Sequence, residues 1–253
     1  MGGNGHCAAR LLAARAALEG MPEPLTLFDI PYPGFEGRPA AGTFDGFLDS
    51  LAGYFHALTG EGHLVYGHGI GGLFALCLRA RGELLSTPLL LQGPVLWGLE
   101  RRMMPRLMRL APLRAQLPLL FQNRAFQDRF VRRYFLRPLS ETMHRDFFAG
   151  YAQCAALSDF FRWLNPSLLR ELEQGFKTHP DRLKNLLVWI GEKDRVVGMN
   201  EVLWARAALG AWIPVGAISD WGHYPMLDDP KDWIRTLEKV GTTMVEGSTY
   251  ENR

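Results

Sequence analysis

The sequence lacks the features that would tie it to a membrane, an export route or a disulfide scaffold. It has no apolar run of about 18 residues and no signal peptide, so we expect neither a membrane span nor export. Its three cysteines, Cys7, Cys77 and Cys154, are odd in number, far apart and set in apolar stretches. Such cysteines are typical of reduced core residues, which predicts a cytoplasmic location.

A strong net charge is also absent. The chain has 28 lysines and arginines against 26 acidic residues, a net charge of +2, so overall charge predicts no nucleic-acid partner. His63 and His68 have no further partner at zinc-site spacing, so no metal and no cofactor are expected. With 253 residues, 47% of them hydrophobic, the chain has the size and composition of one α/β domain.

A glycine-rich stretch at residues 64–76 is the most informative part of the sequence. Leu64 to Tyr66 predicts a buried strand, and Leu73 to Leu78 predicts the start of a buried helix. Glycines 67, 69, 71 and 72 lie between them and permit a sharp turn. A plain strand-to-helix connection and a phosphate-binding G-x-G-x-x-G loop are the alternatives. The phosphate loop needs an acid after the next strand, and that strand ends in Gln92-Gly93-Pro94 instead.

Strand and helix patterns alternate around this stretch. Leu25 to Ile30 predicts a short strand, and the proline- and glycine-rich residues 31–39 predict a loop. Thr43 is a candidate N-cap for a helix with an apolar stripe between residues 44 and 58. Pro88 to Leu91 predicts another buried strand. This alternation predicts a parallel sheet with helices on both faces.

Three short motifs resemble those of the α/β-hydrolase superfamily. The run Gly67-His68-Gly69-Ile70-Gly71-Gly72 resembles the nucleophile elbow, with Gly69 at the position of the serine. The strand at residues 186–190 leads into a loop that resembles the acid loop, with Asp194 as the acid. Residues 222–230 resemble the histidine loop, with His223 as the base. The order nucleophile, acid, histidine is the one expected on this fold.

The resemblance implies an α/β-hydrolase fold, a mostly parallel sheet flanked by helices with a helical cap inserted between core strands. It implies a first part of the core at residues 1–96, a cap at 97–184, a second part of the core at 185–245 and a frayed tail at 246–253. The strand that feeds the oxyanion loop would precede Met1, so N-terminal strands are expected to be missing. The strand at 25–30 and the elbow strand would then pair directly or stand one strand's width apart.

The resemblance also implies an oxyanion hole. Its backbone donors would be Gly3 or Asn4, in the glycine loop at the N-terminus, together with Ile70, which follows the nucleophile position.

The segment from Arg101 to Arg137 contains ten arginines and one acid, Asp128. A solvated cap surface is one interpretation, and a surface for an anionic partner is the other: an acyl-carrier protein, coenzyme A or a membrane. Interleaved apolar residues, among them Met103, Met104 and Leu107, would suit a flexible acyl chain or ordinary packing. Aromatic residues between 147 and 163 are predicted to lie in the core.

The expected function depends on Gly69, which has no side chain to attack a carbonyl. In the superfamily a serine attacks an ester, thioester or amide, histidine takes its proton and aspartate holds the imidazole. The resemblance therefore implies a relative of ester and thioester hydrolases that binds a small-molecule or acyl ligand and lacks ordinary esterase activity. Two alternatives remain. The chain is a Ser-to-Gly inactive form of a carboxylesterase, lipase or thioesterase, or the Asp194–His223 pair acts as a general base without a covalent intermediate.

Overall fold

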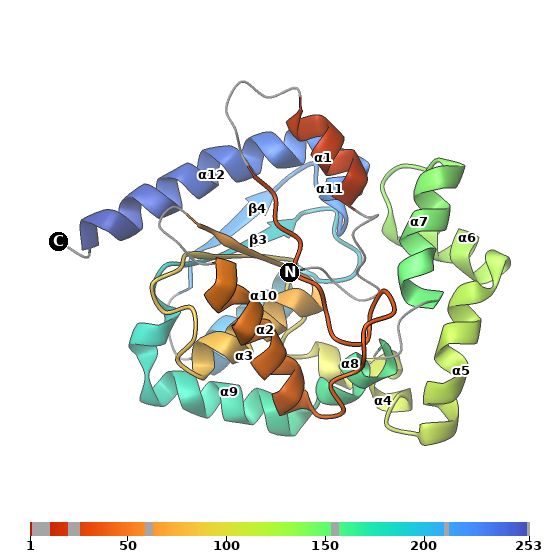
Figure 1. The fold of residues 1–253 in the computed structure, drawn as a ribbon, viewed down its shortest axis with the longest axis horizontal. Helices are drawn as coiled ribbons and strands as arrows, with labels where there is room; N and C mark the ends of the chain where they lie inside the picture. The colour runs from red at the N-terminus through yellow and green to blue at the C-terminus, as the bar shows by residue number, and fades with distance from the viewer. Residues whose placement is uncertain (2–10, 20–25, 59–62, 153–156, 210–212, 252–253) are drawn as a thin grey trace.

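One parallel sheet lies at the centre of the computed structural model (Figure 1), which describes residues 1, 11–19, 26–58, 63–152, 157–209 and 213–251. Within these residues the sheet has four strands in the order β1-β2-β3-β4. The strands are β1 Val65–His68, β2 Leu89–Gln92, β3 Leu186–Gly191 and β4 Val215–Ile218. This confirms the parallel sheet predicted from the alternating pattern.

The strand register brings the functional loops to one edge. His68 pairs with Gln92 and Gln92 with Trp189, while Gly191 pairs with Ile218 at the end of the sheet. Because all the pairs are parallel, the carboxyl ends of the strands lie together. The loops that begin at residues 69, 93, 192 and 219 therefore leave the sheet at the same edge.

Helices cover both faces of the sheet (Figure 1). On one face α3 packs against β1 and β2, and α2 and α9 pack against α3. On the other face α1, α11 and α12 pack against one another. The bounds of these helices and of α10, which contacts α9, are α1 Leu12–Leu18, α2 Phe44–Leu58, α3 Ile70–Ala80, α9 Pro166–Thr178, α10 Met199–Leu209, α11 Pro225–Asp228 and α12 Pro230–Glu251. Thr43 caps α2 as predicted, because its hydroxyl accepts a hydrogen bond from the Gly46 N–H.

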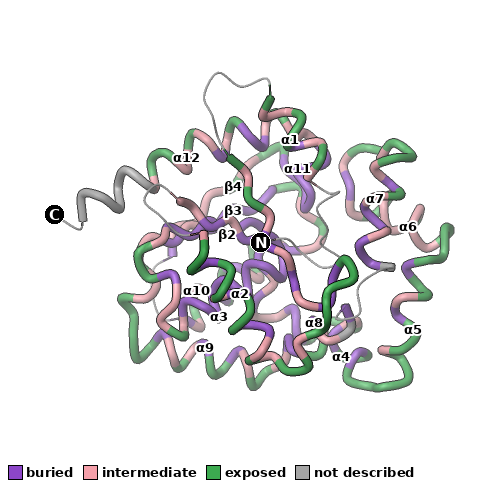
Figure 2. Tube along the Cα trace, in the orientation of Figure 1, coloured by how far each residue is buried: buried purple, intermediate pink, exposed green. Residues whose placement is uncertain are grey.

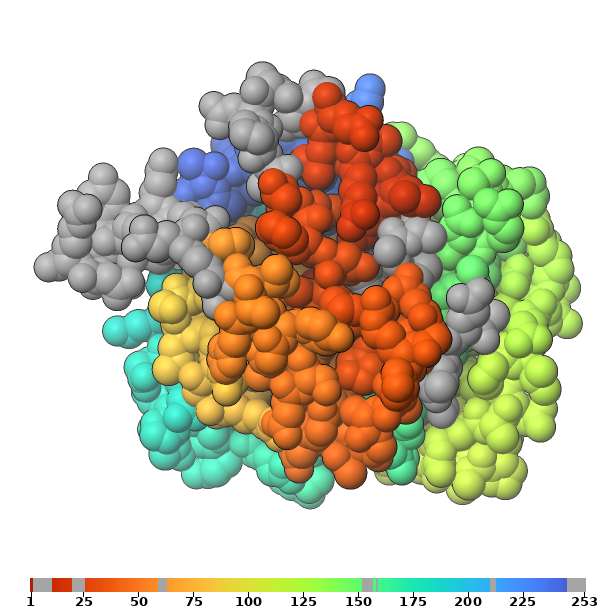
Figure 3. Space-filling view, viewed as in Figure 1, coloured from red at the N-terminus to blue at the C-terminus, as the bar shows by residue number. Residues whose placement is uncertain are grey.

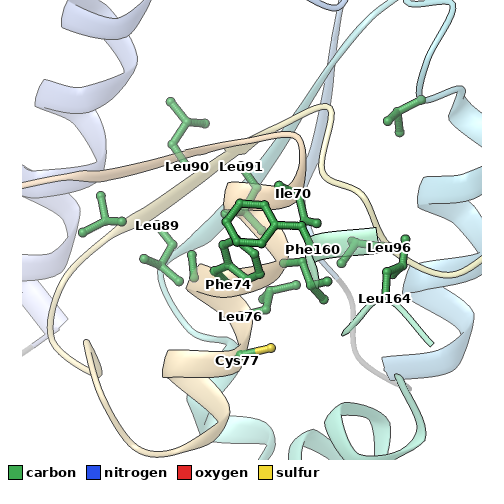
Figure 4. Packing of buried hydrophobic residues seen from close by; sticks show 14 of the residues in the cluster. Ile70, Phe74, Leu76, Cys77, Leu89, Leu90, Leu91, Leu96, Phe160 and Leu164 are labelled. Atoms are coloured by element: carbon green, nitrogen blue, oxygen red, sulfur yellow. The ribbon is translucent and has the colours of Figure 1, made fainter. Parts of the chain in front are cut away.

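The main core lies between α3 and the sheet (Figure 4). Nearly every residue of α3 is buried, as are all four residues of β2. Phe160 and Phe74 are in edge-to-face contact, with ring centroids 4.8 Å apart. Of the aromatic residues predicted to be core, those at positions 147, 148, 151, 160 and 163 are buried, which confirms that they pack in the core, and Phe161 is partly buried against it.

Further helices lie between β2 and β3. They are η2 Leu99–Arg101, α4 Met103–Leu107, α5 Ala111–Gln122, α6 Arg124–Tyr134, α7 Glu141–Ala152, α8 Leu157–Trp163 and, after α9, η3 Pro180–Leu183. Helices α5, α6 and α7 form a lobe beside the carboxyl edge of the sheet (Figures 1 and 3). Figure 2 shows exposed stretches along α5, whereas exposed and intermediate residues alternate along α6. These helices occupy the place expected for a cap, and the boundaries of core and cap stay predictions.

The expected strand at Leu25–Ile30 is wrong. Residues 26–30 are irregular, and Phe28 is 53% exposed. A strand needs a neighbour for its backbone groups, and the outer edge of β1 is bonded to Met1 instead. The Met1 amino group donates to the Tyr66 carbonyl at 2.6 Å, and the His68 N–H donates to the Met1 carbonyl at 3.0 Å. Among the described residues no strand lies on this side of β1.

The end of the chain is more regular than expected. Helix α12 continues to Glu251, so the described part of the predicted frayed tail is helical. In the described ranges, no helix combines the length and the apolar character that crossing a bilayer requires.

Candidate active site

The turn at Gly69 joins the end of β1 to the start of α3. Gly69 has φ 57° and ψ −123°, a backbone conformation that residues with side chains rarely adopt. Its N–H donates to the Gln92 carbonyl at 3.1 Å, and its carbonyl accepts from the Val95 N–H at 2.9 Å. The turn is therefore fastened on both sides to the residues that end and follow β2.

Strand and helix approach closely on either side of this turn. A Cβ atom added to Gly67 would lie 2.9 Å from the Gly72 Cα, and one added to Gly72 would lie 2.9 Å from the Pro94 Cβ. Neither glycine can therefore carry a side chain without movement of the backbone around it. The sharp strand-turn-helix geometry predicted for residues 64–76 is present.

Asp194 and His223 form a buried pair. The Nδ1 atom of His223 lies 2.8 Å from Oδ2 of Asp194, and the two side chains are 5% and 0% exposed. The other carboxylate oxygen of Asp194 accepts hydrogen bonds from the N–H groups of Val196 and Val197, at 2.7 and 2.9 Å. Three donors thus satisfy the buried carboxylate. The pair leaves Nε2 of His223 as the nitrogen that can take a proton.

Buried polar groups hold the backbone of His223. Its carbonyl accepts a hydrogen bond from the Gln92 side chain at 3.3 Å and lies 2.7 Å from Nε2 of His68. The Tyr66 hydroxyl donates to the Gln92 side-chain oxygen, and the Trp233 indole donates to the Tyr66 hydroxyl at 3.2 Å. Burial raises the pKa of the Tyr66 hydroxyl, so it stays protonated and able to donate. This series of hydrogen bonds connects α12, through β1 and β2, to the histidine loop.

The pair lies close to the turn at Gly69. The rings of His68 and His223 are 4.7 Å apart between centroids, and His68 directly precedes Gly69. On the side of β2, a Cβ atom added to Gly93 would lie 2.9 Å from Oδ2 of Asp194 and 3.2 Å from Nδ1 of His223. The three loops that carry Gly69, Asp194 and His223 therefore meet around the end of β2.

The structure places the other predicted site residues unevenly. Ile70 is the first residue of α3, so its N–H has no acceptor within the helix, and its role as an oxyanion donor stays a prediction. Gly3 and Asn4 lie outside the described residues.

Met103 is 72% exposed and Leu107 36% exposed, while Met104 packs partly against the core. A cavity of about 110 Å³ is lined by Leu12, Ala13, Thr142, Met143, Asp146, Phe147 and Leu227, without these three residues. The substrate-binding set therefore stays a prediction.

Gln92 and Gly93 are site residues that the sequence pattern did not assign. Gln92 is fully buried and touches the histidine loop, and Gly93 lies against both members of the pair. The available signal was a polar residue followed by glycine at the end of an otherwise apolar strand. In a parallel sheet such a position faces the loops of both neighbouring strands.

Comparisons with known proteins agree with this geometry. The sequence model described as "Alpha/beta hydrolase family" matches residues 3–236. A loop variant of the haloalkane dehalogenase DbeA from Bradyrhizobium elkanii superposes with a TM-score of 0.61 at 17% identity, covering 88% of this chain and 81% of that one. The haloalkane dehalogenase DatA from Agrobacterium tumefaciens C58 gives 0.59 at 16% identity, covering 83% and 76%.

A membrane phospholipase A, described as a bacterial virulence factor, superposes with a TM-score of 0.54 at 18% identity. The match covers 86% of this chain and 69% of the phospholipase. At these identities the solved structures support the fold and not a shared reaction. A search of the curated proteins finds no significant match.

Proposed function

Since the chain belongs to the alpha/beta hydrolase family, we propose that it binds an ester-like or other acyl small molecule at the Gly69 turn without forming a covalent acyl-enzyme. The observation that carries the proposal is the coexistence of two features. Gly69 has the backbone conformation of a strained turn residue, with φ 57°, and the buried Asp194–His223 pair lies beside it. We take Gly69 as the position of a family nucleophile that this chain lacks.

The arrangement supports ligand binding at the carboxyl edge of the sheet. The N–H of Ile70 opens the first turn of α3, where unpaired N–H groups and the helix dipole favour a partly negative oxygen. A carbonyl oxygen placed there would bring its carbon over Gly69. No atom of Gly69 can attack that carbon, so the bound acyl group would remain intact.

A second candidate function is general-base chemistry without a covalent intermediate. It is favoured by the complete set of hydrogen bonds around Asp194, which holds the Nδ1–H tautomer of His223 and stabilises a positive imidazole. His223 would then take a proton at Nε2 from water or from the ligand. In this case the pair acts directly on the water or the ligand.

Hydrolysis of p-nitrophenyl butyrate separates these functions. We expect wild type to hydrolyse it at the rate of the His223→Ala variant, and we expect Gly69→Ser to exceed both. Gly69→Ser combined with His223→Ala should return to background. A wild-type rate that falls on His223→Ala replacement would favour general-base chemistry. Wild-type turnover with a covalent burst would contradict both candidates, because it requires a nucleophile other than residue 69.

We also propose that the chain acts in the cytoplasm. Cys77, a free cysteine, is buried in α3, and burial raises the pKa of its thiol. A buried thiol of this kind is inert and typical of a reducing compartment.

A further inference from the structure

Helices α4 and α5 expose apolar side chains in an unusual concentration. Met103 is 72% exposed, and Leu110 and Leu119 are each 56% exposed. Leu107, Leu113 and Leu120 are exposed as well. In α5 only Leu117 and Phe121 are buried, although apolar residues occur on every side of this helix. A helix that is apolar all round is normally buried, so the outer side of α5 has the character of a surface that receives an apolar partner.

Arginines alternate with these apolar residues. From residue 101 to residue 127 the sequence has six arginines and no acid. Arg106 and Arg109 are exposed, and neither forms an ion pair with another described residue. Arg124, at the far end of the segment, differs because Glu141 lies 2.8 Å and Asp128 3.0 Å from its guanidinium. Arg101 and Arg102 also contact acids, Glu100 and Glu201, so the positive charge that no ion pair neutralises within the described part of the chain includes that of Arg106 and Arg109.

Helix α10 extends this surface. Arg102, just before α4, contacts Glu201 of α10 at 2.6 Å and donates to the Val196 carbonyl at short range. A Cβ atom added to Gly98 would lie 2.5 Å from the Trp204 ring, so α10 lies directly against the segment that leads into α4. Trp204 is 54% exposed, and Leu203 and Met199 are exposed beside it. The exposed residues of 103–120 and α10 are called the docking face below.

We propose that the docking face binds the surface of an anionic lipid bilayer. Its leucines, methionines and Trp204 enter the boundary between headgroups and acyl chains, and Arg106 and Arg109 remain at the level of the lipid phosphates. Tryptophan favours this boundary because its ring is apolar and its N–H is polar. This inference concerns the outer surface and is independent of the reaction at the Gly69 turn.

The distribution of the residues favours a bilayer over other polyanions. A nucleic acid would pair with the arginines and leave the exposed leucines and methionines in contact with a charged backbone. An acidic protein would need an apolar surface of complementary shape, whereas the docking face is spread over short helices. A fluid bilayer surface adapts to such a shape and needs no preformed complementarity.

Vesicle flotation of the full chain tests the proposal. The probes are vesicles of phosphatidylcholine alone and vesicles with about 30% phosphatidylglycerol added. We expect binding to the anionic vesicles only, weakening as salt rises because exposed charges are screened. Arg106→Glu with Arg109→Glu should weaken partitioning about 30-fold or more, since each arginine near the surface contributes about fivefold. Leu110→Ser with Leu119→Ser should weaken it about tenfold or more.

Matched controls lie elsewhere on the surface. Arg132→Glu with Arg133→Glu makes the same charge change on α6, and Leu85→Ser removes an apolar side chain that is 48% exposed before β2. Both controls should bind clearly better than the corresponding docking-face variants. Absence of wild-type binding, or equal losses in variants and controls, would overturn the proposal. A loss with the arginine variant and none with the leucine variant would also overturn it, and would assign the face to an acidic protein or another polyanion.

Discussion

The Nδ1 atom of His223 lies 2.8 Å from Oδ2 of Asp194, and the carboxylate is fully buried. Two backbone N–H groups hold the other oxygen of Asp194, so the orientation of the pair does not depend on a bound ligand. A buried carboxylate costs free energy unless its oxygens are satisfied. Here both oxygens of Asp194 are satisfied, and the neighbouring Gly69 has no nucleophilic side chain for His223 to activate.

Serine at position 69 should make the protein less stable than glycine does. At φ 57° and ψ −123° a Cβ atom is strained, so we expect Gly69→Ser to cost about 1–3 kcal/mol of unfolding free energy. For a chain of this size that corresponds to a melting temperature lower by about 2–10 °C. Gly69→Ala is the control, because it adds the Cβ atom without the hydroxyl and should lose a similar amount. Thermal unfolding followed by circular dichroism measures both. An unchanged or higher melting temperature would mean that the turn tolerates side chains.

A methyl group at Gly93 should displace the Asp194–His223 pair. Gly93 has φ 49°, and its added Cβ atom would approach Asp194 Oδ2 to 2.9 Å. We expect Gly93→Ala in a Gly69→Ser background to reduce hydrolysis of p-nitrophenyl butyrate by about 100-fold or more, as loss of the base does in related sites. Gly37→Ala is the matched control, since Gly37 has φ 77° and nothing within 4 Å of an added Cβ atom. Equal activity in the two variants would contradict the placement of Gly93 against the pair.

Asp228 should make stability depend on pH in the acidic range. Burial raises the pKa of Asp228 above its ordinary value of 3.8, although hydrogen bonds from Leu136 and Arg137 and the charge of Arg137 oppose the shift. The folded chain therefore keeps the proton on the Asp228 carboxyl group to a higher pH than the unfolded chain does. Its contribution to stability is present below pH 3.8 and is lost as the pH rises through the raised pKa.

The comparison of wild type with Asp228→Asn isolates this contribution. Urea unfolding of both proteins between about pH 4 and pH 7 gives the difference in unfolding free energy at each pH. We expect wild type to lose stability relative to the variant as the pH rises through the raised pKa of Asp228. Above that pKa the difference should level off. A difference that does not change with pH would show that Asp228 titrates equally in the folded and unfolded chains.

The three motif positions were located from sequence by their resemblance to superfamily motifs, and two of them follow buried apolar strands. The strands at β1 and β3 were recognisable as apolar runs, and the residues that follow them, Gly69 and Asp194, stand at fixed distances from the strand ends. His223 follows β4, whose residues are partly buried or exposed, so only the motif at residues 222–230 located it. In a parallel sheet these ends share one edge, so order along the chain was enough to predict proximity.

Other features depended on tertiary contacts that local patterns do not contain. Residues 25–30 have a strand-like composition, yet a strand also needs a partner, and the edge of β1 is bonded to Met1. Gln92 and Gly93 gain their roles because β2 lies between β1 and β3, which places them under the histidine and acid loops. The exposure of Met103 and Leu107 likewise follows from how α4 sits on the surface. The sequence pattern around Met103 and Leu107 would be the same in a buried lid and in an exposed docking face, so it does not distinguish the two.

The most direct test of the account is the intact mass of the protein after treatment with a fluorophosphonate, for wild type and Gly69→Ser. We expect no adduct on wild type, and on the variant one adduct that peptide mapping places on the serine introduced at position 69. The added His223→Ala replacement should abolish that adduct, because the serine then has no base. An adduct on wild type, or a folded Gly69→Ser variant that gains none, would contradict the claim that Gly69 occupies the nucleophile position beside a working histidine.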